Sequence, residues 1–279
     1  MSDHPATGLE LVWRYDPTVP DPSAPPESAA AAQTLLERGN QAFADALRRH
    51  AAGEAVRHVT PIGAQDVGLD AAGDSPPDHV PFAAVVGCSD ARVPLELILG
   101  QQANDVFVVR VAGNVLGREC LGSLEYAVDH LERLRLLVVL GHTNCGAVRA
   151  AVDAYLDAPA YLVGAADPPL RAIIDGLMAP VRAAAQALDS LGAGLDGDDL
   201  RDALVTTAVT LNAAVNAASL RHVFRGSLGD RLDVRFGVYA LEDRTVSVLT
   251  QPGLGEPPRD QAALDALARA AAEHALRSV

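Results

Sequence analysis

Residues 81–92 read Pro-Phe-Ala-Ala-Val-Val-Gly-Cys-Ser-Asp-Ala-Arg, and this stretch decides the fold. Its first part, 81–87, is an apolar run without polar alternation, which is typical of a parallel strand buried on both faces. Residues 106–111 and 136–140 are two further runs of this kind, and an amphipathic helix is predicted between them over 121–134. Strand, loop, helix and strand in this order predict an α/β fold, in which a central, mostly parallel β-sheet is flanked by helices.

The remaining chain adds an N-terminal helical arm and a C-terminal helix to this α/β domain. Prolines concentrated in residues 1–28 predict a flexible, extended arm. The Ala-rich segment that follows predicts helices with a break near Gly39 and Asn40, and residues 53–80 form a long connection. The predicted divisions are the arm over 1–28, N-terminal helices over 29–52, the α/β domain over 53–255 with an insertion near 156–200 that holds a helix near 170–190, and a C-terminal helix over 256–279.

The composition restricts the partners and the compartment of the protein. Acidic side chains outnumber Lys and Arg by 36 to 22, and the formal net charge of −14 disfavours nucleic acid and anionic membranes as partners. Three cysteines, Cys88, Cys120 and Cys145, are too few for a disulfide framework in 279 residues, and they indicate metal ligands or free thiols in a reducing compartment. No basic segment followed by an apolar run marks a secretory signal, so a cytoplasmic location is expected.

A second segment, His142-Thr143-Asn144-Cys145-Gly146, follows the third predicted strand as Cys88 follows the first. The carboxyl ends of parallel strands meet at one edge of a sheet, so the fold is expected to bring two thiolates and one imidazole together. This donor set suits zinc, and three protein ligands leave one tetrahedral position open, as in catalytic zinc sites. A closed structural zinc site and two buried free cysteines remain the alternatives.

Asp90 and Arg92 follow Cys88 closely and carry opposite charges. Their pairing through charge-assisted hydrogen bonds would keep Asp90 ionised and direct it at the fourth zinc position. There Asp90 would accept a hydrogen bond from a zinc-bound hydroxide, which forms because zinc lowers the pKa of water to about 7. Two alternatives stay open: an ordinary surface ion pair, and Asp90 as a fourth ligand that closes the site. The small or apolar neighbours that would line a pocket for a small uncharged substrate such as carbon dioxide are Val93, Leu97, Ala112, Gly113 and Val115.

Four segments of the chain resemble the β-class carbonic anhydrases. They are Cys88-Ser89-Asp90-Ala91-Arg92-Val93-Pro94, Val109-Arg110-Val111-Ala112-Gly113-Asn114, Gly122-Ser123-Leu124-Glu125-Tyr126-Ala127-Val128 and Gly141-His142-Thr143-Asn144-Cys145-Gly146-Ala147-Val148. The resemblance implies Cys88, His142 and Cys145 as ligands of one Zn²⁺ per subunit, and Asp90 and Arg92 as a catalytic dyad. The implied reaction is the reversible hydration of carbon dioxide to bicarbonate and a proton. The resemblance also implies a homodimer or a dimer of dimers, in which residues 29–52 embrace the partner subunit.

The resemblance further indicates a substrate pocket and departs from the family's pattern at two positions. The pocket residues are expected to be Val93, His79, Ala112, Gly113 and Asn114. Val111 stands where many members have Asn, and His79 is nearest to the position of a Gln that reaches the active site across the dimer. Hydrolysis of carbonyl sulfide or carbon disulfide at the same zinc is one alternative function, and an inactive zinc-bearing scaffold is another.

Overall fold

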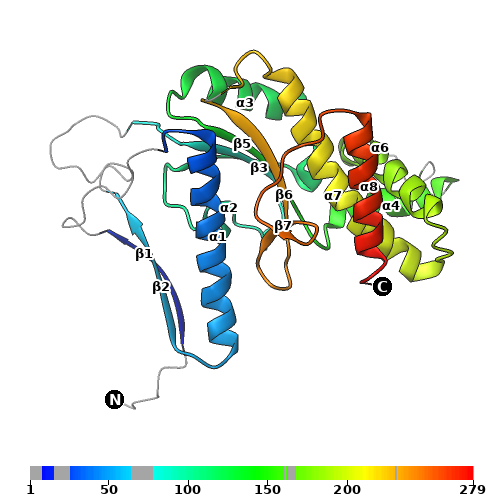
Figure 1. The fold of residues 1–279 in the computed structure, drawn as a ribbon, viewed down its shortest axis with the longest axis horizontal. Coiled ribbons are helices and arrows are strands. Elements are labelled where there is room, and N and C mark those ends of the chain that lie inside the picture. Colours follow the sequence, from blue (N-terminus) through cyan, green and yellow to red (C-terminus); the bar gives the residue numbers. More distant parts are fainter. Residues whose placement is uncertain are drawn as a thin grey trace.

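A six-stranded β-sheet lies at the centre of the molecule, with helices against both of its faces (Figure 1). The computed structural model describes residues 8–15, 26–63, 78–159, 161, 168–229 and 231–278. The strand order is β4-β3-β5-β6-β7-β8. The parallel strands are β3 (Ala83–Gly87), β4 (Val106–Arg110), β5 (Leu136–His142) and β6 (Asp233–Tyr239). The antiparallel strands are β7 (Val246–Val248) and β8 (Gln251–Pro252). The prediction of a mostly parallel sheet flanked by helices is therefore confirmed.

The central strands β3 and β5 are buried on both faces, which explains why their sequences do not alternate. Along β5, Leu136 and Val138 pack with α1 (Ala29–Ala51) and α2 (Leu95–Ile98) on one face. The intervening residues Leu137 and Val139 pack on the other face with the apolar side chains of two other helices. These helices are α3 (Arg118–His130) and α7 (Gly197–Val223). Since a fully buried Val or Leu contributes about 1.5–3 kcal/mol, burial on both faces makes this sheet a rigid support for the loops at its edge.

A group of helices packs beside the sheet around a second apolar core. This group consists of α7 together with α4 (Gly146–Leu156), α6 (Pro168–Ser190) and α8 (Gln261–Ala275), and it lies at the right of Figure 1. The helices predicted near 170–190 and at the C-terminal end are thus present. Among the described helices, α7 is long and apolar enough to cross a membrane, but 72% of its most apolar window is buried inside the fold, as expected of a core helix.

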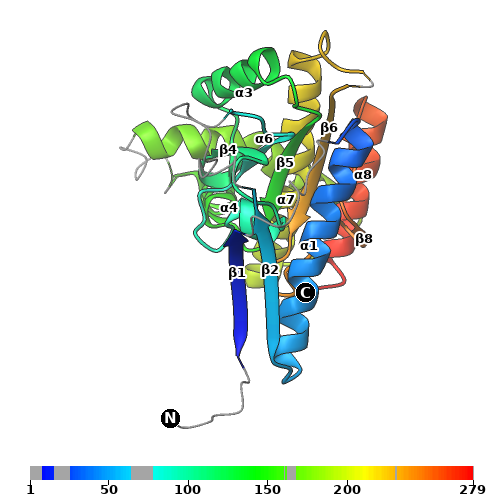
Figure 2. The same ribbon diagram turned by 90° about the vertical axis from the view of Figure 1, so that its left-hand side faces the viewer.

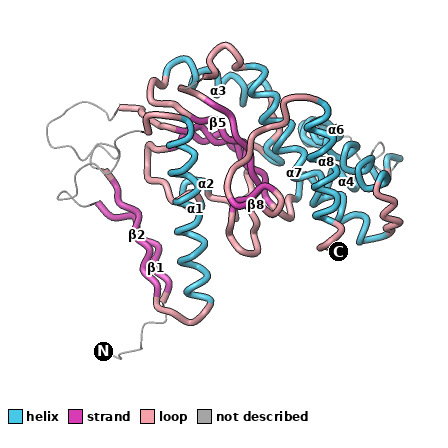
Figure 3. The backbone as a smooth tube through the Cα atoms, viewed as in Figure 1, coloured by secondary structure: helices cyan, strands magenta, loops and turns pink. Residues whose placement is uncertain are grey.

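An arm outside the main sheet consists of the projecting end of α1 and a separate two-stranded parallel sheet (Figure 2). Its strands are β1 (Leu9–Tyr15) and β2 (Val56–Ile62), which Figure 3 shows running beside α1. The predictions of a flexible arm over 1–28 and a connection over 53–80 are therefore wrong where these segments pair as β1 and β2. This pairing is not visible locally, because β2 contains Pro61 and its partner strand lies on the other side of α1 in the sequence. Residues 1–7, 16–25 and 64–77 of the predicted arm and connection lie outside the described part of the chain.

The predicted break near Gly39 and Asn40 is wrong, since α1 is one continuous helix over Ala29–Ala51. Gly39 lies where the helix touches the loop after α2, and a Cβ there would collide with the Leu99 carbonyl oxygen. Asn40 is buried and donates hydrogen bonds to the carbonyl oxygens of Ile98, at 2.9 Å, and Arg244, at 3.0 Å. Gly39 and Asn40 thus allow α1 to pack against the loops at Leu99 and Arg244, and the helix continues through both residues.

Candidate metal site

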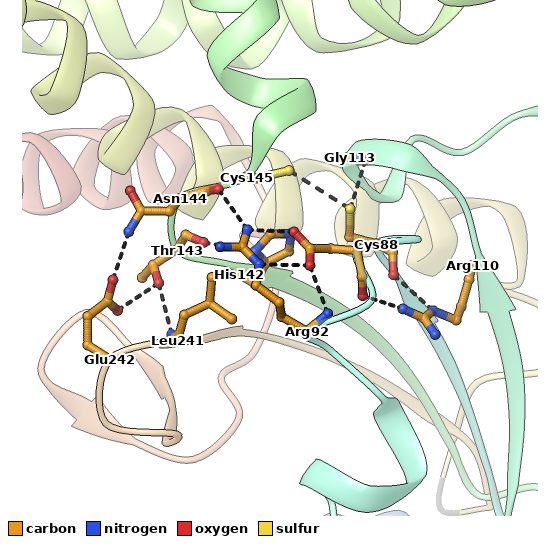
Figure 4. Close-up of polar contacts among 11 residues, drawn as sticks. Cys88, Arg92, Arg110, Gly113, His142, Thr143, Asn144, Cys145, Leu241 and Glu242 are labelled. Carbon is orange, nitrogen blue, oxygen red and sulfur yellow. Dashed lines mark hydrogen bonds and ion pairs between the residues drawn. The ribbon is translucent and has the colours of Figure 1, made fainter.

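Three potential metal ligands meet where two neighbouring strands of the main sheet end. Cys88 follows β3, His142 is the last residue of β5, and Cys145 directly precedes α4. Because β3 and β5 pair in parallel, with Gly87 beside Leu140, their carboxyl ends lie together. The ligand atoms of the three side chains lie within 4.8 Å of one another, and all three residues are buried. The structure therefore brings together the donor set that the sequence analysis selected (Figure 4).

The geometry of the cluster fits a tetrahedral zinc ion. Zn–S bonds of about 2.3 Å place two sulfur ligands about 3.8 Å apart, and the Sγ atoms of Cys88 and Cys145 are 4.0 Å apart. His142 Nδ1 lies 2.8 Å from the Thr143 carbonyl oxygen, which can act only as an acceptor, so Nδ1 carries the proton. The other ring nitrogen, Nε2, is buried and has no hydrogen-bond partner among the described residues. Its free lone pair is the form of imidazole that binds a metal.

The environment of the two thiols favours a thiolate. A hydrogen bond with Cys145 lowers the pKa of Cys88, and the same contact, together with burial, raises the pKa of Cys145. The backbone N–H of Gly113 also donates to Cys88 Sγ at 3.3 Å. Burial lowers the pKa of His142, but the contacts with Cys88, the Thr143 carbonyl group and Asp90 together outweigh this effect, and the net shift is upward. Because the ligands bind metal in their deprotonated forms, metal uptake by this cluster must release protons.

Asp90 and Arg92 form a two-pronged ion pair beside the cluster. Arg92 Nε donates to Asp90 Oδ1 at 3.0 Å, Arg92 Nη2 donates to Oδ2 at 2.7 Å, and the Arg92 backbone N–H donates to Oδ1 at 2.9 Å. These hydrogen bonds hold the pKa of the Asp90 carboxyl group well below its usual range. Asp90 Oδ2 lies 3.8 Å from His142 Nε2, so the carboxylate faces the ligand cluster. Arg92 thus holds both oxygens of Asp90, the pairing that the sequence analysis associated with an open fourth position.

Two residues that the sequence analysis did not select hold the ligand loops in place. Arg110, at the end of β4, donates from Nε to the Cys88 carbonyl oxygen at 3.0 Å and from Nη2 to the Asp90 carbonyl oxygen. Glu242 accepts hydrogen bonds from Thr143 Oγ1 and Asn144 Nδ2, both at 2.8 Å. A charged residue at the end of an apolar strand was a usable signal for Arg110, whereas nothing in the sequence around Glu242 indicated its contact.

Two asparagines of the core helix α7 support the turn that contacts Cys88. This turn, the 3-10 helix η2 (Ala112–Asn114), has Gly113 at φ 63°. Asn212 is buried and donates from Nδ2 to the Gly113 carbonyl oxygen at 2.8 Å. Asn216 donates to Asn212 Oδ1 at 3.0 Å and to the Asn114 carbonyl oxygen at 3.1 Å. The amide side chains thereby fix the carbonyl groups of a turn whose Gly113 N–H points at the Cys88 sulfur.

The residues expected to form the substrate pocket are distributed unevenly around the cluster. Ala112, Gly113 and Asn114 form the η2 turn next to Cys88. Val93 is fully buried in the core beneath the Asp90–Arg92 loop. His79 is exposed and its ring lies against Phe107 of β4, with ring centroids 5.9 Å apart. No contact among the described residues joins His79 to the ligand cluster, and its role in the pocket stays a prediction.

Comparison with known proteins identifies the family. The sequence model of the carbonic anhydrase family matches residues 83–245. "Carbonic anhydrase 2" of Mycobacterium tuberculosis is 41% identical over 133 residues, a match that spans 48% of this chain and 57% of that protein. A carbonic anhydrase of Mycolicibacterium smegmatis is 51% identical over 74 residues, which span 26% of this chain and 35% of that protein. The match thus spans little more than half the length of the first of these relatives.

Solved structures agree with the sequence matches. A β-carbonic anhydrase of Aspergillus fumigatus has a TM-score of 0.51 at 25% identity, over 68% of this chain and 82% of that one. A structure described as a tetrameric β-carbonic anhydrase, from Sordaria macrospora, has a TM-score of 0.50 at 26% identity, over 61% of this chain and 81% of that one. The family match covers more than half of the residues and contains all three candidate ligands together with Asp90 and Arg92. The chain therefore belongs to the β-class carbonic anhydrase family.

Proposed function

We propose that this protein is a zinc enzyme that catalyses the reversible hydration of carbon dioxide to bicarbonate and a proton. The observation that carries the proposal is the combination of a buried Cys88–His142–Cys145 cluster with an ionised Asp90 held against it by Arg92. Bound zinc would lower the pKa of a coordinated water to about 7, which supplies a nucleophile at neutral pH. The homology supports the choice of reaction, since the matching relatives are named carbonic anhydrases.

Asp90 would orient the reacting water. An ionised carboxylate can only accept hydrogen bonds, so it holds an O–H group and repels a bare oxygen anion. Arg92 keeps Asp90 ionised and fixes its orientation through hydrogen bonds at 2.7 and 3.0 Å. The buried ligands and the Ala112–Asn114 turn would exclude other water molecules from the reacting carbon, which strengthens these polar interactions. The charge of Asp90 thus favours a neutral substrate at the reacting position.

A stopped-flow assay of carbon dioxide hydration by the zinc-loaded protein tests this proposal. Asp90→Asn should lower the rate by about 10²–10⁴-fold, the usual contribution of a positioned acid or base, while the zinc content stays unchanged. The matched control is Asp45→Asn, because Asp45 forms an exposed 2.6 Å ion pair with Arg48 on α1. A zinc-loaded protein with no rate above buffer would leave the inactive scaffold as the better interpretation. Faster turnover of carbon disulfide than of carbon dioxide would favour the alternative function, hydrolysis of carbonyl sulfide or carbon disulfide at the same site.

We also propose that the protein is cytoplasmic and forms a homodimer or a dimer of dimers. Each subunit would be divided, as predicted, into the arm, the N-terminal helix, the α/β domain and the C-terminal helix. The description of the Sordaria macrospora protein as tetrameric supports an assembled state. Light scattering combined with size-exclusion chromatography measures the mass directly. A monomer at every protein concentration would contradict this part of the proposal.

A further inference from the structure

The arm sheet, β1 with β2, exposes large apolar side chains on both of its faces. Leu11, Trp13 and Tyr15 alternate along β1, share one face and are 38%, 48% and 39% exposed. On the other face, Val12 pairs in register with Val59, which is 36% exposed. Parallel sheets are normally buried, and a sheet of two strands is marginally stable by itself in water. An exposed apolar surface of this kind marks a docking site.

The outer edge of β1 is also open. The Val56 N–H donates to the Gly8 carbonyl oxygen at 3.0 Å, so the even-numbered residues of β1 direct their backbone groups toward β2. The odd-numbered residues, among them Leu11 and Trp13, direct theirs to the opposite edge. Within the described part of the chain, β1 pairs with no strand other than β2, and in Figure 2 it lies on the side of β2 away from α1. Its sequence, Leu-Glu-Leu-Val-Trp-Arg-Tyr, contains no proline or glycine to block pairing.

We propose that this edge binds the same edge of a second copy of the chain, in antiparallel register around a two-fold axis at Val12. In this register Leu11 and the partner subunit's Trp13 form a hydrogen-bonded pair, because both direct their backbone groups to the open edge. Glu10 lies opposite the partner subunit's Arg14, and the symmetry produces this charge pair twice. The sequence of β1 is thus complementary to itself when reversed about Val12.

The alternative registers lose this complementarity. A shift by two residues places Val12 opposite the partner subunit's Glu10 and removes both cross-strand charge pairs. A shift by one residue turns the side chains to opposite faces and brings backbone groups that already bond to β2 to the joint edge. Glu10 already pairs with Arg57 of β2, at 3.1 Å, so the added contact extends an existing charge network across the interface. Charge and hydrogen-bond direction therefore select one register.

The resulting four-stranded sheet would bring exposed apolar side chains of the two subunits into contact across the shared edge. On one face, Val59 and Val12 would line up with the partner subunit's Val12 and the partner subunit's Val59, so that one apolar row crosses the four strands. On the other face, Leu11 would pack against the partner subunit's Trp13, an aliphatic–aromatic cross-strand pair of the stabilising kind. This contact lies on the arm, apart from the metal site, and it adds a specific location to the subunit association that family membership implies. The inference goes beyond the proposed reaction and does not depend on it.

Cysteine cross-linking of the full-length, zinc-loaded protein tests the register. The Cys120→Ser background removes the free thiol outside the metal site. Val12→Cys places two thiols at a non-hydrogen-bonded pair with Cα atoms about 4.5 Å apart, within the range that disulfides bridge. The matched control is Val59→Cys, which is more exposed than Val12 but lies three strand spacings, about 14 Å, from its copy in the partner. We expect a rapid intermolecular cross-link for Val12→Cys under mild oxidation and little for Val59→Cys. Equal rates for the two variants would overturn the proposal.

Charge reversal in the Val12→Cys protein gives a second test. Arg14→Glu alone and Glu10→Arg alone should each slow cross-linking several-fold, because like charges then face each other twice. A mixture of the two variants should restore the rate, since both cross-strand pairs become complementary in the mixed dimer. A mixture that reacts no faster than either variant alone would refute the register. In the unmodified protein, Trp13 is the one tryptophan, and its emission should shift to the red on dilution. Emission that is independent of protein concentration, together with slow cross-linking, would show that another surface covers β1.

Discussion

Removing the side-chain amide of Asn212 should weaken zinc binding although Asn212 touches no ligand atom. Asn212 is 2% exposed and donates to the Gly113 carbonyl oxygen at 2.8 Å, and the Gly113 N–H in turn donates to Cys88 Sγ at 3.3 Å. In Asn212→Leu, the buried carbonyl group loses this donor, which costs about 1–3 kcal/mol of folding stability. The turn with Gly113 at φ 63° then loses the bond that holds it against α7.

The expected loss of zinc affinity follows from the position of Asn212 in this chain of contacts. Residues that hydrogen-bond directly to metal ligands typically change metal affinity by about 10–100-fold when mutated. Asn212 acts through one further peptide group, so we expect the lower end, about tenfold, which corresponds to about 1.4 kcal/mol. In the cobalt-substituted protein, the sulfur-to-metal charge-transfer band should move to lower energy, because the Cys88 thiolate that loses an N–H donor becomes richer in electrons.

Asn40→Leu is the matched control, because Asn40 is also buried, at 4% exposure, and also bonds to backbone groups. Both variants should lower the urea midpoint of unfolding, whereas only Asn212→Leu should lower the zinc affinity measured by competition with a chelator. Asn212→Leu with wild-type affinity and an unshifted cobalt band would refute the reasoning. Equal losses of affinity in both variants would show that the effect follows from general destabilisation.

Three further predictions concern the loops around the cluster. Glu242→Gln keeps one acceptor oxygen for Thr143 and Asn144 and should reduce zinc affinity less than Glu242→Ala, as chelator competition would show. Arg92 lowers the pKa of Asp90 in the folded protein, so the stability that the pair adds is present above the unfolded pKa of about 3.9 and is lost as the pH falls through the folded pKa. The urea midpoint of Arg92→Met should therefore lie below that of the wild type near neutral pH, and the gap should close in acid. Zinc removal should abolish hydration and lower the thermal midpoint, and rebinding should weaken with falling pH as His142 gains a proton.

The sequence made the main sheet and its ligands predictable because their signals are local. Each central strand is an apolar run that ends in a chemically distinctive residue, and parallel strands necessarily bring those ends together. Cys88, His142 and Asp90 could therefore be selected before the structure was known. The arm sheet could not, because β1 and β2 are separated by α1 and neither strand carries an unbroken apolar run.

Contacts between distant segments account for what sequence reasoning missed. Gly39 and Asn40 are a common helix-breaking pair in isolation, yet here the missing Cβ and the buried amide allow α1 to approach the Leu99 loop. Asn212 and Asn216 lie one turn apart on α7, and nothing near them in the sequence shows a partner until the Gly113 turn is placed against the helix. Glu242 accepts hydrogen bonds from Thr143 and Asn144, which precede it in the chain by 99 and 98 positions.

These distant contacts explain why the ligands can be arranged by the protein itself. Arg110 binds the carbonyl groups of the loop that carries Cys88 and Asp90, and Glu242 binds the turn between His142 and Cys145. Arg110 ends β4 and Glu242 lies in the turn between β6 and β7, so movement of either ligand loop would require breaking charge-assisted hydrogen bonds that do not involve a metal. Folding itself then orders the ligand loops and takes up most of the conformational entropy that this ordering loses. Less of the free energy of zinc binding is therefore needed to arrange Cys88, His142 and Cys145. The same rigidity would fix Asp90 relative to the fourth coordination position of a bound zinc, where a small displacement would have a large effect on rate.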